Sequence, residues 1–153
     1  MMGFRKGRYD VSFADSADDI RAAQHLRWLC FIGRGQQDGD QDALDADDYD
    51  DRCTHVLIRD PEGRLVACFR MLTISCGAEI GDSYSARYYN LSRLRDFDGR
   101  MVEIGRFCIH PQVQDPDILR VAWGALARHV DEQDVAMLFG CSSFIGTDTH
   151  DYE

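Results

Sequence analysis

The sequence lacks any apolar run that approaches the roughly 18 residues needed for a membrane-spanning helix. The first nine residues also lack the apolar centre of a signal peptide. There is no internal repeat and no low-complexity segment, and 153 residues is the usual size of one domain. We therefore expect a single domain, residues 1–153, that resides in the cytoplasm.

Several motifs with well-defined chemistry are also missing. No glycine-rich phosphate loop and no G-x-S-x-G nucleophile motif occurs, and Cys141 has no obvious histidine partner in the sequence. The aspartate-rich stretch does not follow the calcium-loop order that ends in a glutamate at position twelve, so we expect no metal site. Six cysteines without metal-ligand spacing favour buried, reduced thiols.

Positive charge is scarce, because 17 lysines and arginines face 27 aspartates and glutamates. The net charge of −10 argues against general nucleic-acid binding. The charge is nevertheless uneven: acid gathers in residues 38–51, and arginines gather loosely in residues 87–106, with a smaller basic cluster of Arg5, Lys6 and Arg8. A small acidic carrier or a phosphate group could dock on such arginines, and ordinary solvated side chains are the alternative.

The local patterns predict a mixed α/β or α+β class. Asp15 or Ser16 can cap a helix that runs to about Ile32. Asp115 as N-cap and Pro116 as the first helical residue predict the start of a second helix. The turn sequence at residues 60–63 predicts a hairpin of residues 54–59 and 64–73. Further strands are expected at residues 101–109 and, as a short buried strand, 135–139.

Two arginines fall on apolar faces of these elements. Arg27 shares a helix stripe with Ile20, Ala23 and Phe31, and Arg70 shares a strand face with Cys68 and Leu72. An arginine that stretches from the edge of the core to water is the alternative for Arg27. Taken together, such charges suggest a polar pocket inside the core.

The strand 101–109 carries two more charges, Glu103 and Arg106. On a regular strand, positions three apart point to opposite faces, but Gly105 between them suggests a β-bulge. The extra residue of a bulge would bring both side chains toward one cleft. The alternative is a structural ion pair between them at a strand end.

Residues 37–51 have little apolar content and predict a surface loop. Asp47, Asp48 and Asp50 at the end of this acidic loop could face a cationic substrate, and a solvated acidic loop is the alternative.

Six motifs, in order along the chain, together resemble one family, the ornithine lipid N-acyltransferases, also labelled hemolysin-like. The motifs are Arg27-x-x-x-Phe31, Asp48-Tyr49-Asp50-Asp51, Phe69-Arg70-Met71-Leu72, Glu103-Ile104-Gly105-Arg106 with Cys108-Ile109-His110-Pro111, Trp123-x-x-Leu126-Ala127-Arg128, and Phe139-Gly140-Cys141-x-Ser143-Phe144-x-Gly146-Thr147-Asp148. The family is similar to the acyl-homoserine lactone synthases and has the GNAT acyltransferase fold, a central mixed, mostly antiparallel sheet flanked by helices.

The resemblance implies transfer of a 3-hydroxy fatty acyl group from acyl carrier protein to the α-amino group of ornithine. No cofactor would be bound, because the donor is carried on the phosphopantetheine of the carrier protein. A signal synthase that makes acyl-homoserine lactones, and a silent module that only binds the carrier protein, are the alternatives. Family members continue beyond Asp148, so this chain looks C-terminally truncated. A homodimer and peripheral contact with the inner membrane are further expectations.

The resemblance also implies that a set of charged and aromatic residues lines the active cleft, namely Arg27, Phe31, Asp47 or Asp50, Arg70, Glu103 and Arg106. In this hypothesis Glu103 is the general base, and backbone N–H groups from Gly105 to Phe107 stabilise the developing oxyanion. Arg106, with Arg27 and Arg70, would hold the carboxylate of the amino acid or order the pocket, while the aspartates take the cationic side chain of ornithine.

Overall fold

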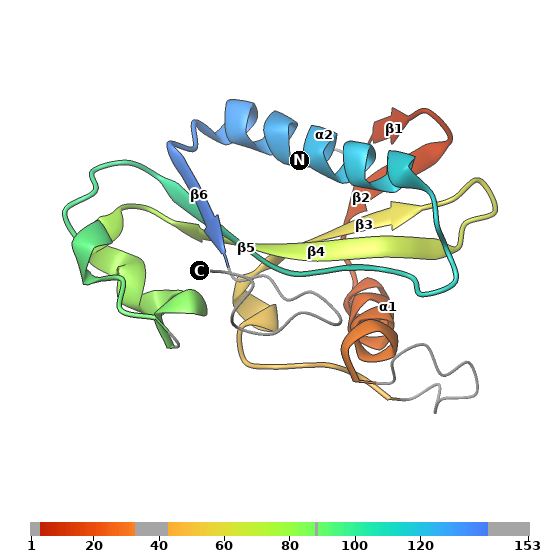
Figure 1. The fold of residues 1–153 in the computed structure, drawn as a ribbon, viewed down its shortest axis with the longest axis horizontal. Coiled ribbons are helices and arrows are strands. Elements are labelled where there is room, and N and C mark those ends of the chain that lie inside the picture. Colours follow the sequence, from red (N-terminus) through yellow and green to blue (C-terminus); the bar gives the residue numbers. More distant parts are fainter. Residues whose placement is uncertain (1–3, 33–42, 88, 141–153) are drawn as a thin grey trace.

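The computed structural model describes residues 4–32, 43–87 and 89–140, which form one six-stranded sheet (Figure 1). The strands lie side by side in sequence order: β1 Phe4–Lys6, β2 Tyr9–Phe13, β3 Thr54–Arg59, β4 Leu65–Ile74, β5 Met101–Ile109 and β6 Met137–Gly140. Neighbouring strands are antiparallel except for β5 and β6, which are parallel. The predicted mixed, mostly antiparallel sheet is confirmed.

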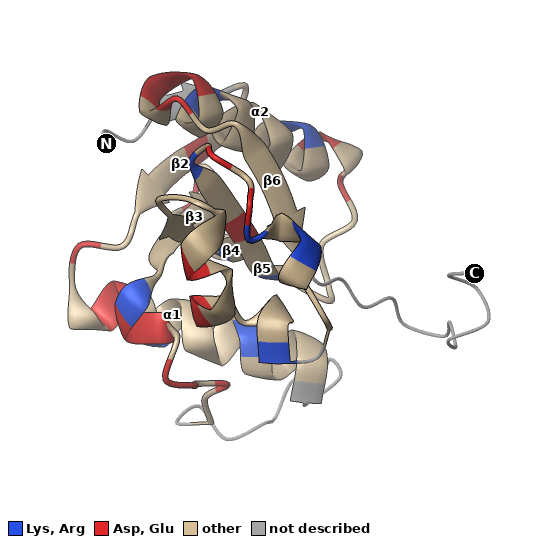
Figure 2. Ribbon diagram, turned by 90° about the vertical axis from the view of Figure 1, so that its left-hand side faces the viewer, with Lys and Arg blue, Asp and Glu red and all other residues tan. Residues whose placement is uncertain are grey.

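Two helices lie on opposite faces of the sheet, α2 above it and α1 below it in Figures 1 and 2. Helix α1 spans Ala17–Arg27 and continues as a π-helical segment, η1 Trp28–Ile32, and α2 spans Pro116–Gln133. Both predicted starts are confirmed. The Ser16 hydroxyl accepts the Asp19 N–H at 3.1 Å, and the Asp115 carboxylate accepts the Asp117 N–H at 3.0 Å.

The predicted hairpin is also confirmed, with β3 and β4 joined through residues 60–63. The Asp60 carboxylate accepts the N–H groups of Glu62 and Arg64, at 3.0 and 2.9 Å, which fixes the turn. Gly63 has φ +84°, a conformation that side chains with a Cβ rarely adopt.

Four short 3-10 helices fill the connections: η2 Asp50–Arg52 before β3, and η3 Gly77–Asp82, η4 Ser85–Arg87 and η5 Ser92–Leu94 between β4 and β5. The last three gather at the end of the sheet that also carries β6 (Figure 1). They place backbone N–H groups beside β5, which becomes important at the site.

The core has two layers, one on each face of the sheet. Ile118, Val121 and Leu126 of α2 pack against side chains such as Val56 and Met71, while Ala23 and Leu26 of α1 pack with Leu57, Cys68 and Cys108 on the opposite face. Five cysteines are free thiols, and Cys141 lies outside the described residues.

The expectation of a short buried strand at residues 135–139 is wrong. The strand begins at Met137, and its residues alternate between half-buried and exposed, because β6 is an edge strand. Leu138 of β6 and Leu119 of α2 are exposed apolar side chains, at 39% and 45%.

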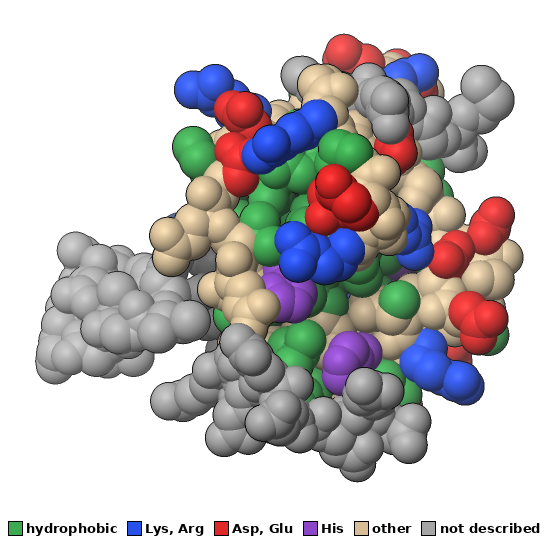
Figure 3. All heavy atoms as spheres, turned by 90° about the vertical axis from the view of Figure 1, so that its right-hand side faces the viewer, with side chains coloured by type: hydrophobic (Ala, Val, Ile, Leu, Met, Phe, Trp, Pro, Cys, Tyr) green, Lys and Arg blue, Asp and Glu red, His purple; other side chains and the backbone are tan. Residues whose placement is uncertain are grey.

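Surface charge is mixed where the β3–β4 turn faces the viewer: Figure 3 shows positive and negative side chains interspersed with hydrophobic ones. In the N-terminal basic cluster, Arg8 forms an ion pair with Asp115, and the side chains of Arg5 and Lys6 lie outside the description. Among residues 4–32, 43–87 and 89–140, no helix is long and apolar enough to cross a membrane.

Candidate active site

The predicted bulge in β5 is confirmed and shapes the site. Arg70 of β4 pairs with Gly105, whereas Cys68 pairs with Cys108, so β5 contains one residue more than β4 in this interval. The unusual backbone conformation falls on Arg106, with φ +52°, rather than on Gly105. Consequently Glu103 and Arg106 both line one cavity.

Glu103 is buried, with 5% of its surface exposed, and both of its carboxylate oxygens accept backbone hydrogen bonds. The N–H of Tyr84 lies 2.8 Å from one oxygen, and the N–H of Ser85 lies 2.6 Å from the other. These donors come from the connection between β4 and β5. The expected alternative, an ion pair between Glu103 and Arg106, is wrong, because each has other partners.

Arg106 extends from the bulge toward α1. Its guanidinium forms an ion pair with Asp45, with Nε at 3.0 Å from the carboxylate, and lies 4.5 Å from the ring centre of Phe31. The side chain is 25% exposed, so it can contact a molecule in the cavity while it keeps its partner.

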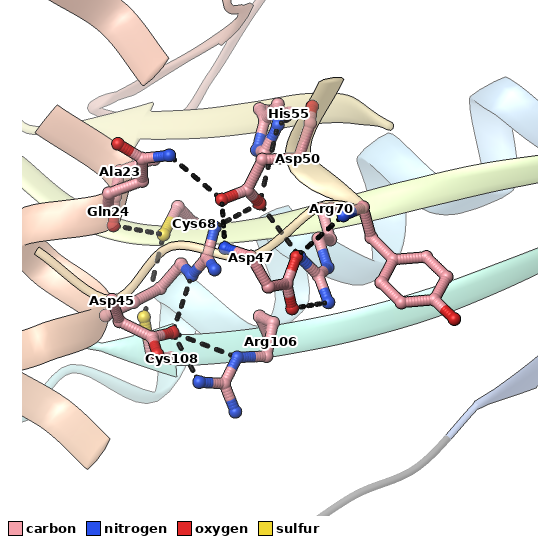
Figure 4. Close-up of polar contacts among 12 residues, drawn as sticks. Ala23, Gln24, Asp45, Asp47, Asp50, His55, Cys68, Arg70, Arg106 and Cys108 are labelled. Atoms are coloured by element: carbon pink, nitrogen blue, oxygen red, sulfur yellow. Dashed lines mark hydrogen bonds and ion pairs between the residues drawn. The ribbon is translucent and has the colours of Figure 1, made fainter. Parts of the chain in front are cut away.

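Arg27 and Arg70 share one buried carboxylate, that of Asp50. Figure 4 shows Asp50 next to Arg70 and Asp47. Oδ1 of Asp50 accepts from Nη1 of Arg27 at 2.7 Å and from Nη1 of Arg70 at 2.8 Å. Arg70 also donates to both oxygens of Asp47, at 2.6 and 2.9 Å, and Arg27 donates to Asp45 at 3.0 Å. Three arginines are thus neutralised by three aspartates.

The pairing fixes the ionisation of this cluster. Burial alone would raise the pKa of Asp50, but hydrogen bonds from Arg27 and Gln24 outweigh burial and hold the pKa at about 2. Burial would also raise the pKa of Asp47, and the bond from Arg70 outweighs it and lowers that pKa. Arg27, 1% exposed, does not reach water as the alternative supposed, and these two aspartates are not a solvated loop.

The acidic segment is attached to α1 and β3 by several bonds. The Asp45 N–H donates to the Gln24 carbonyl at 2.9 Å, the Gln24 amide donates to Asp50 at 2.9 Å, and Nε2 of His55 lies 2.9 Å from the Asp50 carbonyl. Asp48, expected to face a substrate, is exposed, while Asp45 was not predicted at all. Because alternate residues of an extended segment share a side, Asp45 could have been inferred from Asp47.

The cavity has a volume of about 700 Å³ and two chemically different ends. The polar end includes Arg70, Glu103, Tyr49 and Tyr84. The apolar end lies between β5, β6 and α2 and is lined by Phe107, Leu119, Ala122, Trp123, Leu126 and Leu138. Trp123 is 59% exposed, so this end opens to the surface.

The structure brings six of the predicted site residues to the cavity wall and leaves three behind it. Phe31, Arg70, Glu103, Gly105, Arg106 and Phe107 line the cavity. Arg27, Asp47 and Asp50 do not line it; they form ion pairs within the arginine cluster, and their contact with substrate stays a prediction. The motif residues from Cys141 to Asp148 lie outside the described part of the chain.

Tyr49 and Tyr84 line the cavity but were not among the predicted site residues. Their rings meet edge to face, with centres 5.4 Å apart. Residues 76–99 are rich in aromatic side chains, but nothing in the sequence pairs a tyrosine there with Tyr49.

Comparison with known proteins agrees with this architecture. A family model described as an acetyltransferase (GNAT) domain matches residues 26–124, which include α1's end, the acidic segment, the bulged strand and half of α2. The chain belongs to the GNAT acetyltransferase family. The predicted fold is therefore confirmed, and the bulged strand β5 lies within the matched residues.

Curated relatives of this GNAT domain carry the name L-ornithine N(alpha)-acyltransferase. The protein from Rhodobacter capsulatus is 36% identical over 92% of this chain and 58% of its own length. The protein from Brucella abortus is 29% identical over 93% of this chain and 55% of its own length. The chain thus spans a little over half the length of the curated relatives it matches.

Two solved structures show the fold. The AHL synthase LasI superposes with a TM-score of 0.62 at 19% identity, over 88% of this chain and 72% of that one. A ribosomal-protein-alanine N-acetyltransferase from Brucella melitensis biovar Abortus 2308 superposes with a TM-score of 0.58 at 12% identity, over 95% of this chain and 87% of that one.

Proposed function

We propose that this GNAT domain transfers a 3-hydroxy fatty acyl group from acyl carrier protein to the α-amino group of ornithine. The observation that carries the proposal is the buried carboxylate of Glu103 at a cavity with one polar and one apolar end. A small amino acid suits the polar end, and a fatty acyl chain suits the apolar end. The names of the curated relatives support the choice of ornithine.

Glu103 acts as the general base. An ammonium group must lose a proton before its nitrogen can attack a thioester, and the two backbone N–H groups hold the carboxylate in place for this task. Each oxygen keeps a second lone pair for the proton. Nitrogen then forms a bond to the acyl carbon, the carbon–sulfur bond breaks, and the thiol of the donor leaves with a proton.

The bulge of β5 serves the developing oxyanion. A bulge interrupts the hydrogen-bond ladder between strands, so N–H groups around Gly105 to Phe107 can point to the thioester oxygen from the cavity wall. Arg106, anchored by Asp45, adds positive charge at the same place.

The start of α2 supports a carrier-protein donor rather than a nucleotide-linked one. A pyrophosphate would need free backbone N–H groups at a helix N-terminus, and this helix begins with a proline, which has no N–H. The N-cap carboxylate of Asp115 already accepts bonds from Asp117, Tyr9 and Arg8. Residues 112–117 contain two aspartates and no glycine, so an anion would be repelled.

The test is mass spectrometry of a reaction that contains the protein, 3-hydroxyacyl carrier protein, a panel of amino acids and S-adenosylmethionine. An N-(3-hydroxyacyl) ornithine supports the proposal, and a lactone would move the assignment to the signal synthases. Glu103→Gln should lower turnover by about 10² to 10⁴. Glu62→Gln, an exposed turn position, is the matched control and should leave turnover unchanged. Parental turnover in Glu103→Gln would remove Glu103 as the base.

A further inference from the structure

The arginines expected to hold the carboxylate of the amino acid already have carboxylate partners within the protein. Arg27, Arg70 and Arg106 are bound by Asp45, Asp47 and Asp50, at distances of 2.6 to 3.0 Å for the bonds between Arg27 or Arg70 and these aspartates. Their charges balance. An additional anion in the cavity therefore needs another source of positive charge.

Two other arginines, which do not themselves line the cavity, lie against Tyr49, a residue of its polar end. The guanidinium carbon of Arg52 is 4.4 Å from the ring centre of Tyr49, and that of Arg87 is 5.8 Å from the same ring. Tyr49 lines the cavity. Both arginines are exposed. Their backbone N–H groups donate to the carbonyls of Tyr49 and Tyr84, and among the described residues neither side chain has a carboxylate or hydrogen-bond partner.

The positions of these arginines are tied to Glu103. Arg87 ends the short helix η4, whose first residue, Ser85, donates its N–H to Glu103 at 2.6 Å. Arg52 ends η2, which directly follows Tyr49, and the Tyr49 ring packs edge to face on Tyr84. Two elements distant in sequence thus bring two cations to one aromatic platform next to the proposed base.

Two like charges held near one ring repel each other, and an anion between them would relieve the repulsion. In a protein of net charge −10, such a pair is a local exception. The α-carboxylate of an amino acid is separated from its α-amino group by one carbon, so an acceptor with its amine at Glu103 must place its carboxylate close by. The guanidinium fork suits a carboxylate.

We propose that Arg52 and Arg87, stacked on Tyr49, bind the α-carboxylate of the amino-acid acceptor. This inference rests on the proposed function, because it takes Glu103 as the group that receives the amine. Arg87 belongs to the group of arginines on which an acidic partner was expected to dock, and binding of a donor phosphate is the rival outcome. The polar lining favours the small acceptor over the donor.

The test compares two ligands that differ only in the carboxylate: L-ornithine and 1,4-diaminobutane. Binding of each is measured by isothermal titration calorimetry on the full chain, and acyl transfer is measured separately. In the double variant Arg52→Gln and Arg87→Gln, affinity for ornithine should fall about ten- to a hundredfold. Binding of 1,4-diaminobutane should not change. The double lysine variant, which keeps the charges, should recover part of the loss.

Arg120→Gln is the matched control, because Arg120 is an exposed arginine on the outer side of α2 with a single partner, Asp117. The inference is overturned if the double variant binds ornithine like the parent protein, if both ligands weaken equally, or if ornithine does not bind at all. It is also overturned if only the KM of the acyl donor rises. Arginine-dependent binding of ornithine without any acylated product would instead refute the proposed function alone.

Discussion

Asp50→Asn should be strongly destabilising, because Asp50 is the buried acceptor shared by two arginines. Its carboxylate accepts four hydrogen bonds, from Arg27 at 2.7 Å, Arg70 at 2.8 Å, Gln24 at 2.9 Å and the Asp47 N–H at 3.2 Å. The asparagine keeps one acceptor oxygen but loses the negative charge. Its amide N–H groups would face the N–H donors that now bind the second oxygen of Asp50.

The magnitude follows from burial. Arg27 is 1% exposed and Asp50 3% exposed, so the Arg27 guanidinium, left with Asp45 as its remaining carboxylate partner, cannot replace the lost charge by hydration. Removal of one partner from a buried ion pair costs about 3–5 kcal/mol. With a urea slope of about 1–3 kcal/mol/M for a small domain, the midpoint of unfolding should fall by more than about 1 M.

The assay is urea unfolding of both proteins at pH 7, followed by circular dichroism. Asp48→Asn is the matched control, because Asp48 lies in the same segment and is exposed; its effect should stay within about 0.5 kcal/mol. If Asp50→Asn fails to fold, Asp45→Asn gives a milder test of the same cluster, since the Asp45 side chain is 13% exposed. If the free energy of unfolding falls by less than about 1 kcal/mol in Asp50→Asn, the conclusion that this buried carboxylate stabilises both arginines is refuted.

Other predictions concern pH and the edge of the sheet. The pKa of Asp50 is about 2 in the folded protein against 3.8 ordinarily, so ionised Asp50 adds roughly 2 kcal/mol to the free energy of unfolding. This stabilisation is fully present above pH 4 and is lost as the pH falls toward 2. Unfolding measured between pH 5 and 2 should therefore show the difference between parent and Asp50→Asn shrinking with acid, and a constant difference would contradict it. Gly140→Ala should cost about 1–3 kcal/mol, because its Cβ would lie 2.1 Å from the Ile104 carbonyl oxygen in the facing strand. Gly105→Ala, whose Cβ would meet Arg70 at 3.7 Å, is the control in thermal melts, and an equal loss in both would count against the steric argument.

Much of the fold could be predicted from the sequence, because its signals are local. The caps at Ser16 and Asp115, the turn at residues 60–63 and the bulge near Gly105 each depend on a few adjacent residues. The edge position of β6 could not be read in the same way, since a strand's neighbours are set by the whole sheet.

The site could be predicted only in part for the same reason. Charges on apolar faces correctly drew attention to Arg27, Arg70, Glu103 and Arg106, because a buried charge demands a partner. Which partner each would find depends on long-range packing. The acidic segment folds back onto the arginines, so Asp47 and Asp50 form ion pairs with arginines of the protein, and Tyr49 of the same segment lines the cavity.

The contacts of the arginine cluster form an unbranched string of alternating sign: Arg106, Asp45, Arg27, Asp50, Arg70, Asp47. Each inner member has two neighbours of opposite charge, and each end has one. Loss of charge at either end removes one ion pair. Loss of charge at Arg27 or Asp50 removes two ion pairs, divides the string in two and leaves one of the pieces with an unbalanced charge. We therefore expect that a change of charge at one of these six positions is accompanied in relatives by an opposite change at a neighbouring one. Arg27 and Asp50 should vary least among the six.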